Sequence, residues 1–119
     1  MKLSKKFLTS NPGLTLQLSD LSEILDNVTL TKHSLNRLAE RRFHKLVDVE
    51  TVKQDIEKNI YLAYINSDGS VNVAIDNHTY YVFAQNDNSS WSLVTFKEPS
   101  NRGKTVIYKQ MLARLGEHL

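Results

Sequence analysis

The chain has 119 residues and a formal net charge of +2, with 40% apolar and 24% charged side chains. This size and balance predict one globular domain with a single core, and they exclude a disordered chain or a fibrous repeat. Cysteine is absent, which excludes disulfide bridges, cysteine-ligated metals and thiol nucleophiles. No segment has the apolar length of a signal sequence or a membrane span, so we expect a soluble, cytoplasmic protein.

Basic residues gather in two segments of the sequence. Residues 32–45 hold five basic side chains and two histidines, and residues 97–114 hold five more basic side chains, each segment against a single acid. The acids gather instead at 20–26 and 48–57. The two basic segments form one cationic patch only if the fold brings them together.

The first thirty residues show only short patterns. Residues 14–18 alternate like a short strand, and Ser19 after them is positioned to cap a brief helix that ends at Leu25. We therefore distinguish an N-terminal arm or extension, residues 1–30, from a single domain at 31–119.

Two helices are expected next. Thr31 is a suitable N-cap for a helix at 32–42, and Asp48 is a suitable N-cap for the helix that follows it. In the second helix, Val52 and Ile56 lie four residues apart, so both are expected on its buried face.

Four strand patterns follow the helices, with short turns between them. The first two flank Asn66-Ser67-Asp68-Gly69, a strong hairpin signal because Asp-Gly tolerates the positive φ of such a turn. The strands are expected at 60–65, 70–75, 79–85 and 91–96, and a last helix at 104–117. The sequence thus predicts an α+β domain: N-terminal helices packed on a four-stranded antiparallel meander sheet, with a C-terminal helix.

The first candidate site is the cationic face of the helix at 32–42. At 100° per residue, His33, Arg37 and Arg41 fall on one side of this helix, with Lys32 beside them. A solvated, mixed-charge face is the ordinary explanation of such a pattern. The same residue types also suffice for RNA cleavage: a base takes the 2′-hydroxyl proton, cations stabilise the phosphorane, and an acid protonates the leaving 5′ oxygen. RNA supplies its own nucleophile, so this chemistry needs neither metal nor cofactor.

The other candidates lie at the end of the fourth strand and beyond it. Thr95 and Lys97 are two residues apart, so they point to the same side of an extended segment. Ser100 and Arg102 follow in a loop, and Lys104 opens the last helix, where a phosphate can be attracted. We predict catalytic roles for His33, Arg37, Thr95 and Lys97, and substrate-binding roles for Lys32, Arg41, Ser100, Arg102 and Lys104.

These two motifs resemble those of a known family. The stretch at 31–41, TKHSLNRLAER, resembles the tkHaxxRxxxR helix start of small toxin-like and phage-encoded nuclease domains, and 92–97, SLVTFK, resembles their closing vvTv strand. Such domains belong to the barnase–EndoU–colicin–RelE-like superfamily, whose core is helical structure packed on a four-stranded antiparallel sheet. The resemblance covers about residues 29–104. It implies a metal-independent ribonuclease acting on tRNA, mRNA or similar RNA, with site residues carried over to His33, Arg37, Arg41 and Thr95.

Three functions remain open at the level of sequence. The first is a metal-independent endoribonuclease, a toxin or phage effector whose partners are RNA and a cognate antitoxin or immunity protein. The second is a non-catalytic phage accessory or regulatory binding protein on the same scaffold. The third is an immunity or antitoxin protein. RNA cleavage in EDTA that depends on His33 separates the first function from the other two.

Overall fold

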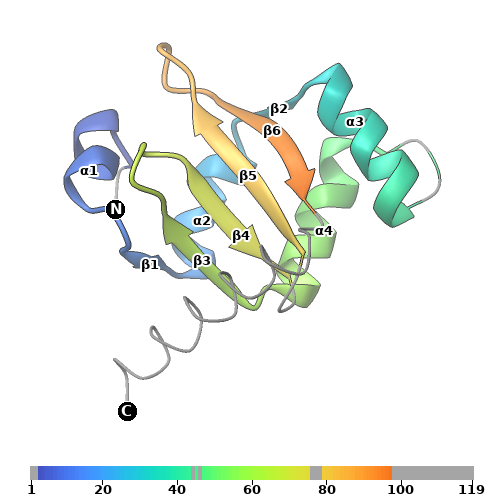
Figure 1. The fold of residues 1–119 in the computed structure, drawn as a ribbon, viewed down its shortest axis with the longest axis horizontal. Helices are drawn as coiled ribbons and strands as arrows, with labels where there is room; N and C mark the ends of the chain where they lie inside the picture. Colours follow the sequence, from blue (N-terminus) through green and yellow to red (C-terminus); the bar gives the residue numbers. More distant parts are fainter. Residues whose placement is uncertain (1–2, 44, 46, 76–78, 98–119) are drawn as a thin grey trace.

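A six-stranded sheet, in the strand order β1-β3-β4-β5-β6-β2, organises the computed structural model (Figure 1). The structure describes residues 3–43, 45, 47–75 and 79–97. Its helices are α1 (Lys5–Ser10), α2 (Leu18–Leu25), α3 (Lys32–Leu38), which continues as a π-helical turn η1 (Ala39–Phe43), and α4 (Val49–Asn59). Its strands are β1 (Thr15–Leu16), β2 (Val28–Leu30), β3 (Leu62–Ile65), β4 (Val71–Ala74), β5 (Tyr80–Gln85) and β6 (Trp91–Lys97). The predicted α+β class is confirmed.

The extent of the sheet differs from the prediction. Strands β3 to β6 are antiparallel neighbours, but β1 and β2 extend the sheet at its two edges, so a sheet of four strands was wrong. At one edge, Thr15 lies opposite Tyr64; at the other, β2 runs parallel to β6 with Val28 opposite Trp91. The alternating stretch at 14–18 contains β1, but the sequence does not show that this strand pairs with β3. Strand β2 has only three residues, too few for alternation to reveal it, and its partner β6 is far away in the sequence. The predicted helix at 104–117 lies outside the described residues.

Local signals place the helix starts well. Asp48 caps α4 as predicted, because its carboxylate accepts the Thr51 N–H at 2.9 Å. The start of α2 differs from the prediction by two residues: its N-cap is Gln17, whose own N–H is held by the Asp20 carboxylate at 2.9 Å. That reciprocal bond replaces the predicted cap at Ser19.

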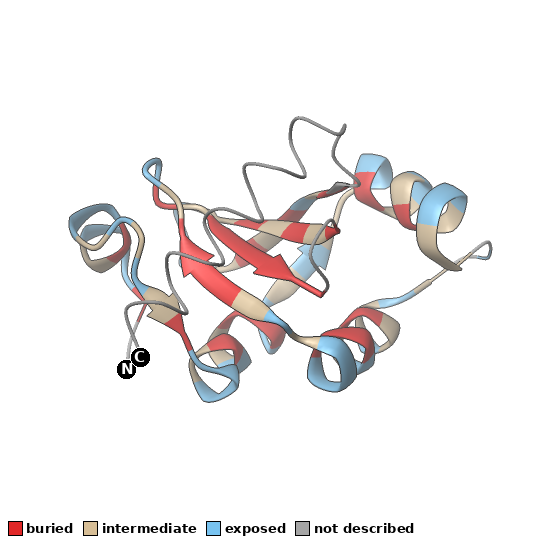
Figure 2. Cartoon of the chain, turned by 60° about the horizontal axis from the view of Figure 1, so that its bottom comes forward, coloured by how far each residue is buried: buried red, intermediate tan, exposed pale blue. Residues whose placement is uncertain are grey.

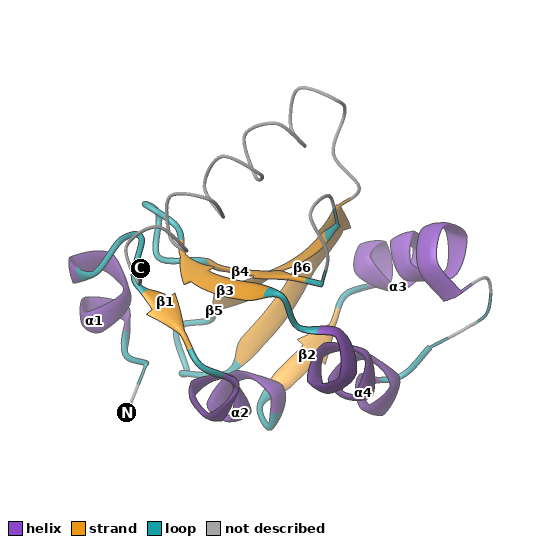
Figure 3. Ribbon diagram, turned by 90° about the horizontal axis from the view of Figure 1, so that it is seen from below, coloured by secondary structure: helices purple, strands orange, loops and turns teal. Residues whose placement is uncertain are grey.

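The core lies between one face of the sheet and helices α2 and α4 (Figures 2 and 3). The helices contribute aliphatic side chains at helical spacing, and the sheet contributes aromatic ones. The largest fully buried side chains include Ile24, Ile56, Tyr81, Phe83 and Trp91. Burial of such side chains is the main stabilising contribution to a domain of this size. No helix in the described part of the chain is long and apolar enough to cross a bilayer.

Two hairpin turns of the sheet repeat the same chemistry at an interval of twenty residues. In the β3–β4 turn, Asn66 Nδ2 donates to Ser70 Oγ at 2.9 Å, and the Asp68 carboxylate accepts the Ser70 N–H. In the β5–β6 turn, Asn86 Nδ2 donates to Ser90 Oγ at 3.0 Å. The Asn88 side-chain oxygen in this turn accepts the Ser90 N–H, as Asp68 accepts the Ser70 N–H in the other turn. The shared pattern gives both turns the same shape.

The residue before each of these serines has a left-handed backbone. It is Gly69 in the first turn, with φ +87°, and Ser89 in the second, with φ +69°. Glycine adopts this conformation without steric penalty, whereas serine does not. The β5–β6 turn is therefore a strained copy of the β3–β4 turn.

Candidate functional site

The cationic helix α3 is fastened to the sheet at its first turn. Thr31 caps the helix: its Oγ1 accepts the Ser34 N–H at 3.1 Å, as predicted, and lies 3.4 Å from the Leu93 carbonyl oxygen of β6. Ser34 is fully buried, and its hydroxyl donates to the Thr31 carbonyl at 2.8 Å. These bonds place the start of α3, with His33, beside β6 (Figure 1).

We define the α3 cationic surface as Lys32, His33, Arg37 and Arg41. The side chains of Lys32, His33 and Arg41 are exposed, and Arg37 is half-buried. Within the part of the chain that the structure describes, none of these four side chains forms an ion pair or a side-chain hydrogen bond. Their hydrogen-bonding groups, and the positive charges of Lys32, Arg37 and Arg41, are therefore available to solvent or to a ligand.

The π-helical turn η1 directs two adjacent arginines to different surroundings, as the helical spacing of Arg41 with His33 and Arg37 indicates. Arg41 is exposed, whereas Arg42 turns inward to Asp55 of α4. Arg42 Nε and Nη2 donate to the two oxygens of that carboxylate at 3.0 and 2.5 Å. Tyr81 OH and Asn59 Nδ2 also donate to Asp55, the latter at 2.9 Å. A carboxylate that is only 8% exposed thus has four donors from three elements.

The electrostatics of this cluster follow from its burial. Burial of Asp55 opposes its ionisation, but the Arg42 guanidinium and the Tyr81 hydroxyl together outweigh that effect and hold the pKa of Asp55 below its usual value. Burial, reinforced by the hydrogen bond to Asp55, raises the pKa of Tyr81 far above its usual value. Asp55 is therefore an anion and Tyr81 a neutral donor throughout the physiological range.

A β-bulge in β6 decides which face of the sheet Thr95 occupies. Phe83 pairs with Leu93, and the next pair along is Val82 with Thr95, so Val94 is an extra residue in β6. Without the bulge, alternation would place Thr95 on the buried face with Leu93. With it, Thr95 lies on the opposite face beside half-buried Val82, and is itself half-buried. Bulges are frequent next to active sites for this reason.

The structure covers only some of the predicted site residues. It places His33, Arg37, Lys32 and Arg41 on α3–η1, and Thr95 on the neighbouring strand β6. Lys97 ends β6, where its backbone pairs with Tyr80. The predicted residues Ser100, Arg102 and Lys104 lie outside the described residues.

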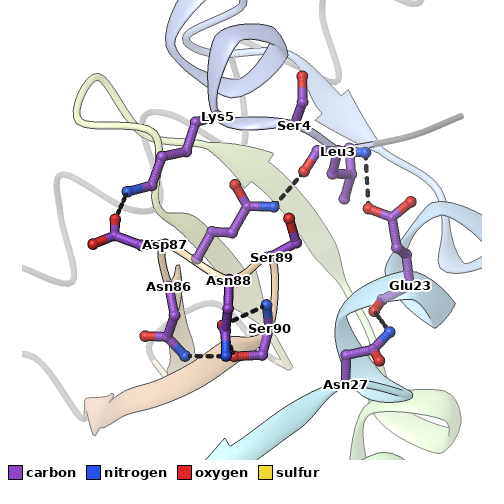
Figure 4. Close-up of a pocket in the computed structure, with 11 residues that line it drawn as sticks. Leu3, Ser4, Lys5, Glu23, Asn27, Asn86, Asp87, Asn88, Ser89 and Ser90 are labelled. Atoms are coloured by element: carbon purple, nitrogen blue, oxygen red, sulfur yellow. Dashed lines mark hydrogen bonds and ion pairs between the residues drawn. The ribbon is translucent and has the colours of Figure 1, made fainter.

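A cavity of about 780 Å³ lies at the other end of β6, between the N-terminal segment, α2 and the β5–β6 turn (Figure 4). Its polar groups mainly hold the protein together. The Glu23 carboxylate accepts the Leu3 N–H at 2.8 Å, Gln85 Nε2 donates to the Leu3 carbonyl at 2.6 Å, and Lys5 pairs with Asp87 at 2.6 Å. The polar groups around the cavity therefore attach the N-terminal segment to the rest of the protein. Sequence patterns did not reveal this attachment. Within the described ranges, no group of three His, Asp or Glu side chains is arranged to hold a metal ion.

Comparisons with family models, with curated proteins and with solved structures found no match. The assignment of a function therefore depends on the chemistry of the residues themselves.

Proposed function

We propose that the protein is a metal-independent endoribonuclease whose active site lies where α3 meets β6. The observation that carries the proposal is an exposed imidazole and two guanidiniums, none of them ion-paired among the described residues, on a helix whose first turn is fastened to β6. The bulge that turns Thr95 away from the core adds a hydroxyl to the neighbouring strand. In this proposal, α3, α4 and strands β3–β6 form the nuclease core.

The residues have distinct roles in the proposed reaction. His33 takes the proton from the ribose 2′-hydroxyl, whose oxygen attacks the adjacent phosphorus and displaces the 5′ oxygen of the next nucleotide. Arg37 donates two hydrogen bonds to the non-bridging oxygens as negative charge grows on them. Arg41 and Lys32 bind neighbouring phosphates, and Thr95 orients the reacting phosphate. The leaving 5′ oxygen takes a proton from water, so the products are a 2′,3′-cyclic phosphate and a free 5′-hydroxyl.

The remaining predictions complete this proposal. Lys97, Ser100, Arg102 and Lys104 stay predicted members of the site. A cytoplasmic toxin or phage effector of this kind acts on tRNA or mRNA, and a cognate antitoxin or immunity protein would restrain it. The division of the chain at residue 30 also stays a prediction, to which the structure adds that β1 and β2 belong to the same sheet as β3–β6.

The test is cleavage of labelled RNA in EDTA by the parent protein and by His33→Ala. Removal of a general base lowers the rate by about 10²–10⁴-fold, whereas loss of an exposed side chain leaves the melting temperature nearly unchanged. A substrate with one 2′-deoxy nucleotide should resist cleavage at that position. Arg37→Gln should also lower the cleavage rate, because it removes the proposed guanidinium bonds to the phosphate. Its matched control is Lys58→Gln, which removes an exposed cation of α4 and should cleave like the parent.

Two results would contradict the proposal. Cleavage by His33→Ala at the parent rate would remove the base from the mechanism. Tight RNA binding without cleavage by the parent would instead favour the non-catalytic binding protein, which uses the same cations without the chemistry.

A further inference from the structure

The α3–η1 helix is held at both ends, and the two attachments differ in strength. At its start, Thr31 Oγ1 lies 3.4 Å from the Leu93 carbonyl, a long hydrogen bond between neutral groups. At its end, Arg42 makes two short, charge-assisted bonds to Asp55. Charge-assisted, bidentate bonds are roughly twice as strong as neutral ones. Among the side-chain bonds, the stronger ones are therefore at the end of the helix, whereas its start also follows directly from β2, where Leu30 pairs with Leu93.

The bidentate geometry fixes orientation as well as distance. Two parallel bonds leave the guanidinium plane one arrangement relative to the carboxylate. Asp55 is itself held by Tyr81 OH from β5 and by Asn59 Nδ2 from its own helix, so the carboxylate cannot rotate to follow Arg42. The rotation of η1 about its axis is thus set by α4 and β5, which belong to the core.

Arg41 and Arg37 share this rotation. Arg41 immediately precedes Arg42 in η1, and Arg37 lies one turn earlier on the continuous helix. We propose that Asp55 is a positioning residue: by holding Arg42 inward through the π-helical turn, it directs Arg37 and Arg41 outward as a phosphate-binding pair. This inference depends on the proposed function, because the pair acts on an RNA phosphate. It adds that the buried carboxylate, which contacts no substrate, sets the geometry of the site.

The central variant is Asp55→Asn, which retains the size of the side chain, removes the charge that holds Arg42 and replaces one accepting oxygen with a donor. Arg42→Lys is the second variant: it retains the charge and loses the bidentate fork, so it perturbs orientation more than folding. The matched control is Ile56→Val on the same helix. Ile56 follows Asp55 in the sequence and is fully buried in the core, but it takes no part in the hydrogen bonds of Asp55. Ile56→Val therefore destabilises the domain and leaves those bonds intact.

The orientation of Arg37 and Arg41 can be tested by two measurements, RNA cleavage and NMR. In RNA cleavage, Asp55→Asn and Arg42→Lys should lower kcat at least tenfold, because misdirected guanidiniums lose contacts made in the transition state. Ile56→Val should leave kcat within twofold of the parent. In NMR spectra without RNA, both network variants should shift the amide resonances of residues 32–41, and the arginine Nε–H signals of Arg37 and Arg41 should lose their response to inorganic phosphate.

The two measurements separate this inference from the proposed function. If the parent cleaves no RNA but the network variants shift the resonances of 32–41 and abolish the phosphate response, the nuclease proposal fails and the positioning role stands. If the resonances of 32–41 and the phosphate response are those of the parent in Arg42→Lys, the positioning role is overturned. A loss of kcat in Ile56→Val equal to that in the network variants overturns it as well.

Discussion

The strained turn between β5 and β6 predicts the effect of a mutation, and the equivalent β3–β4 turn, which has glycine at the strained position, provides the comparison. Ser89 has φ +69°, whereas its counterpart Gly69 in the β3–β4 turn has φ +87°. A left-handed backbone costs an L-residue about 1–2 kcal/mol. Glycine removes that penalty but gives the unfolded chain additional freedom worth about 0.4–1 kcal/mol. Ser89→Gly should therefore stabilise the protein by about 0.5–1 kcal/mol.

Thermal denaturation measures this effect. An unfolding entropy of about 2.1 cal/mol/K per residue, over a chain of this length, corresponds to about 0.25 kcal/mol per degree. Ser89→Gly should thus raise the melting temperature by about 2–4 °C. The transition can be followed by circular dichroism and by the fluorescence of Trp91, the sole tryptophan, which is fully buried.

The reciprocal change is the control. Gly69→Ser imposes the same backbone penalty, and a Cβ at that position would also lie 3.2 Å from Thr9 Cγ2. It should therefore destabilise the protein by more than Ser89→Gly stabilises it. A neutral or destabilising effect of Ser89→Gly would refute the reasoning, because it would mean that the β5–β6 turn stores no strain.

Three further changes test other parts of the structure. Leu3→Ala should lower the free energy of unfolding by about 2–4 kcal/mol, because this side chain is 1% exposed in the main core; urea denaturation measures the loss, and one below about 1 kcal/mol would mean that the N-terminal segment is not docked. The pKa of Asp55 is lowered by folding, so its stabilisation is complete above the unfolded value near 3.8 and is lost as the pH falls through the lower folded value. Acid denaturation of Asp55→Asn should accordingly depend less steeply on pH than that of the parent, and parallel curves would contradict this assignment. Thr31→Ala should destabilise α3 by about 1 kcal/mol through loss of its N-cap, and Thr31→Ser should recover most of the melting temperature.

Local chemistry made part of the fold predictable. The caps Thr31 and Asp48 and the turn Asn66–Gly69 act through residues three or four positions away, so the sequence displays both partners of each contact at once. Helices α3 and α4 and strands β3–β6 were predictable for this reason. The exposure of His33 and Arg41 follows from the same helical spacing.

Features that depend on distant partners could not be read in this way. The alternation of Trp91 and Leu93 points Thr95 inward, and only the pairing with β5 shows the bulge that turns it outward. Helical spacing separates Arg41 from Arg42, but it does not show that Arg42 pairs with Asp55, which in the sequence looks like one acid of an exposed helix. The roles of the site residues stay predictions, since they concern a reaction with RNA, and a contact with RNA is not encoded in the spacing of residues along the chain.

The parallel pairing of β2 with β6 has a consequence for how the chain acquires its structure. Val28 must find Trp91 about sixty positions away, and the intervening strands form with nearer neighbours. During synthesis, β2 leaves the ribosome long before β6, the strand that it pairs with, exists. Val28 and Leu30 must therefore wait unpaired, and translation speed through β3–β6 sets how long this strand is exposed to aggregation.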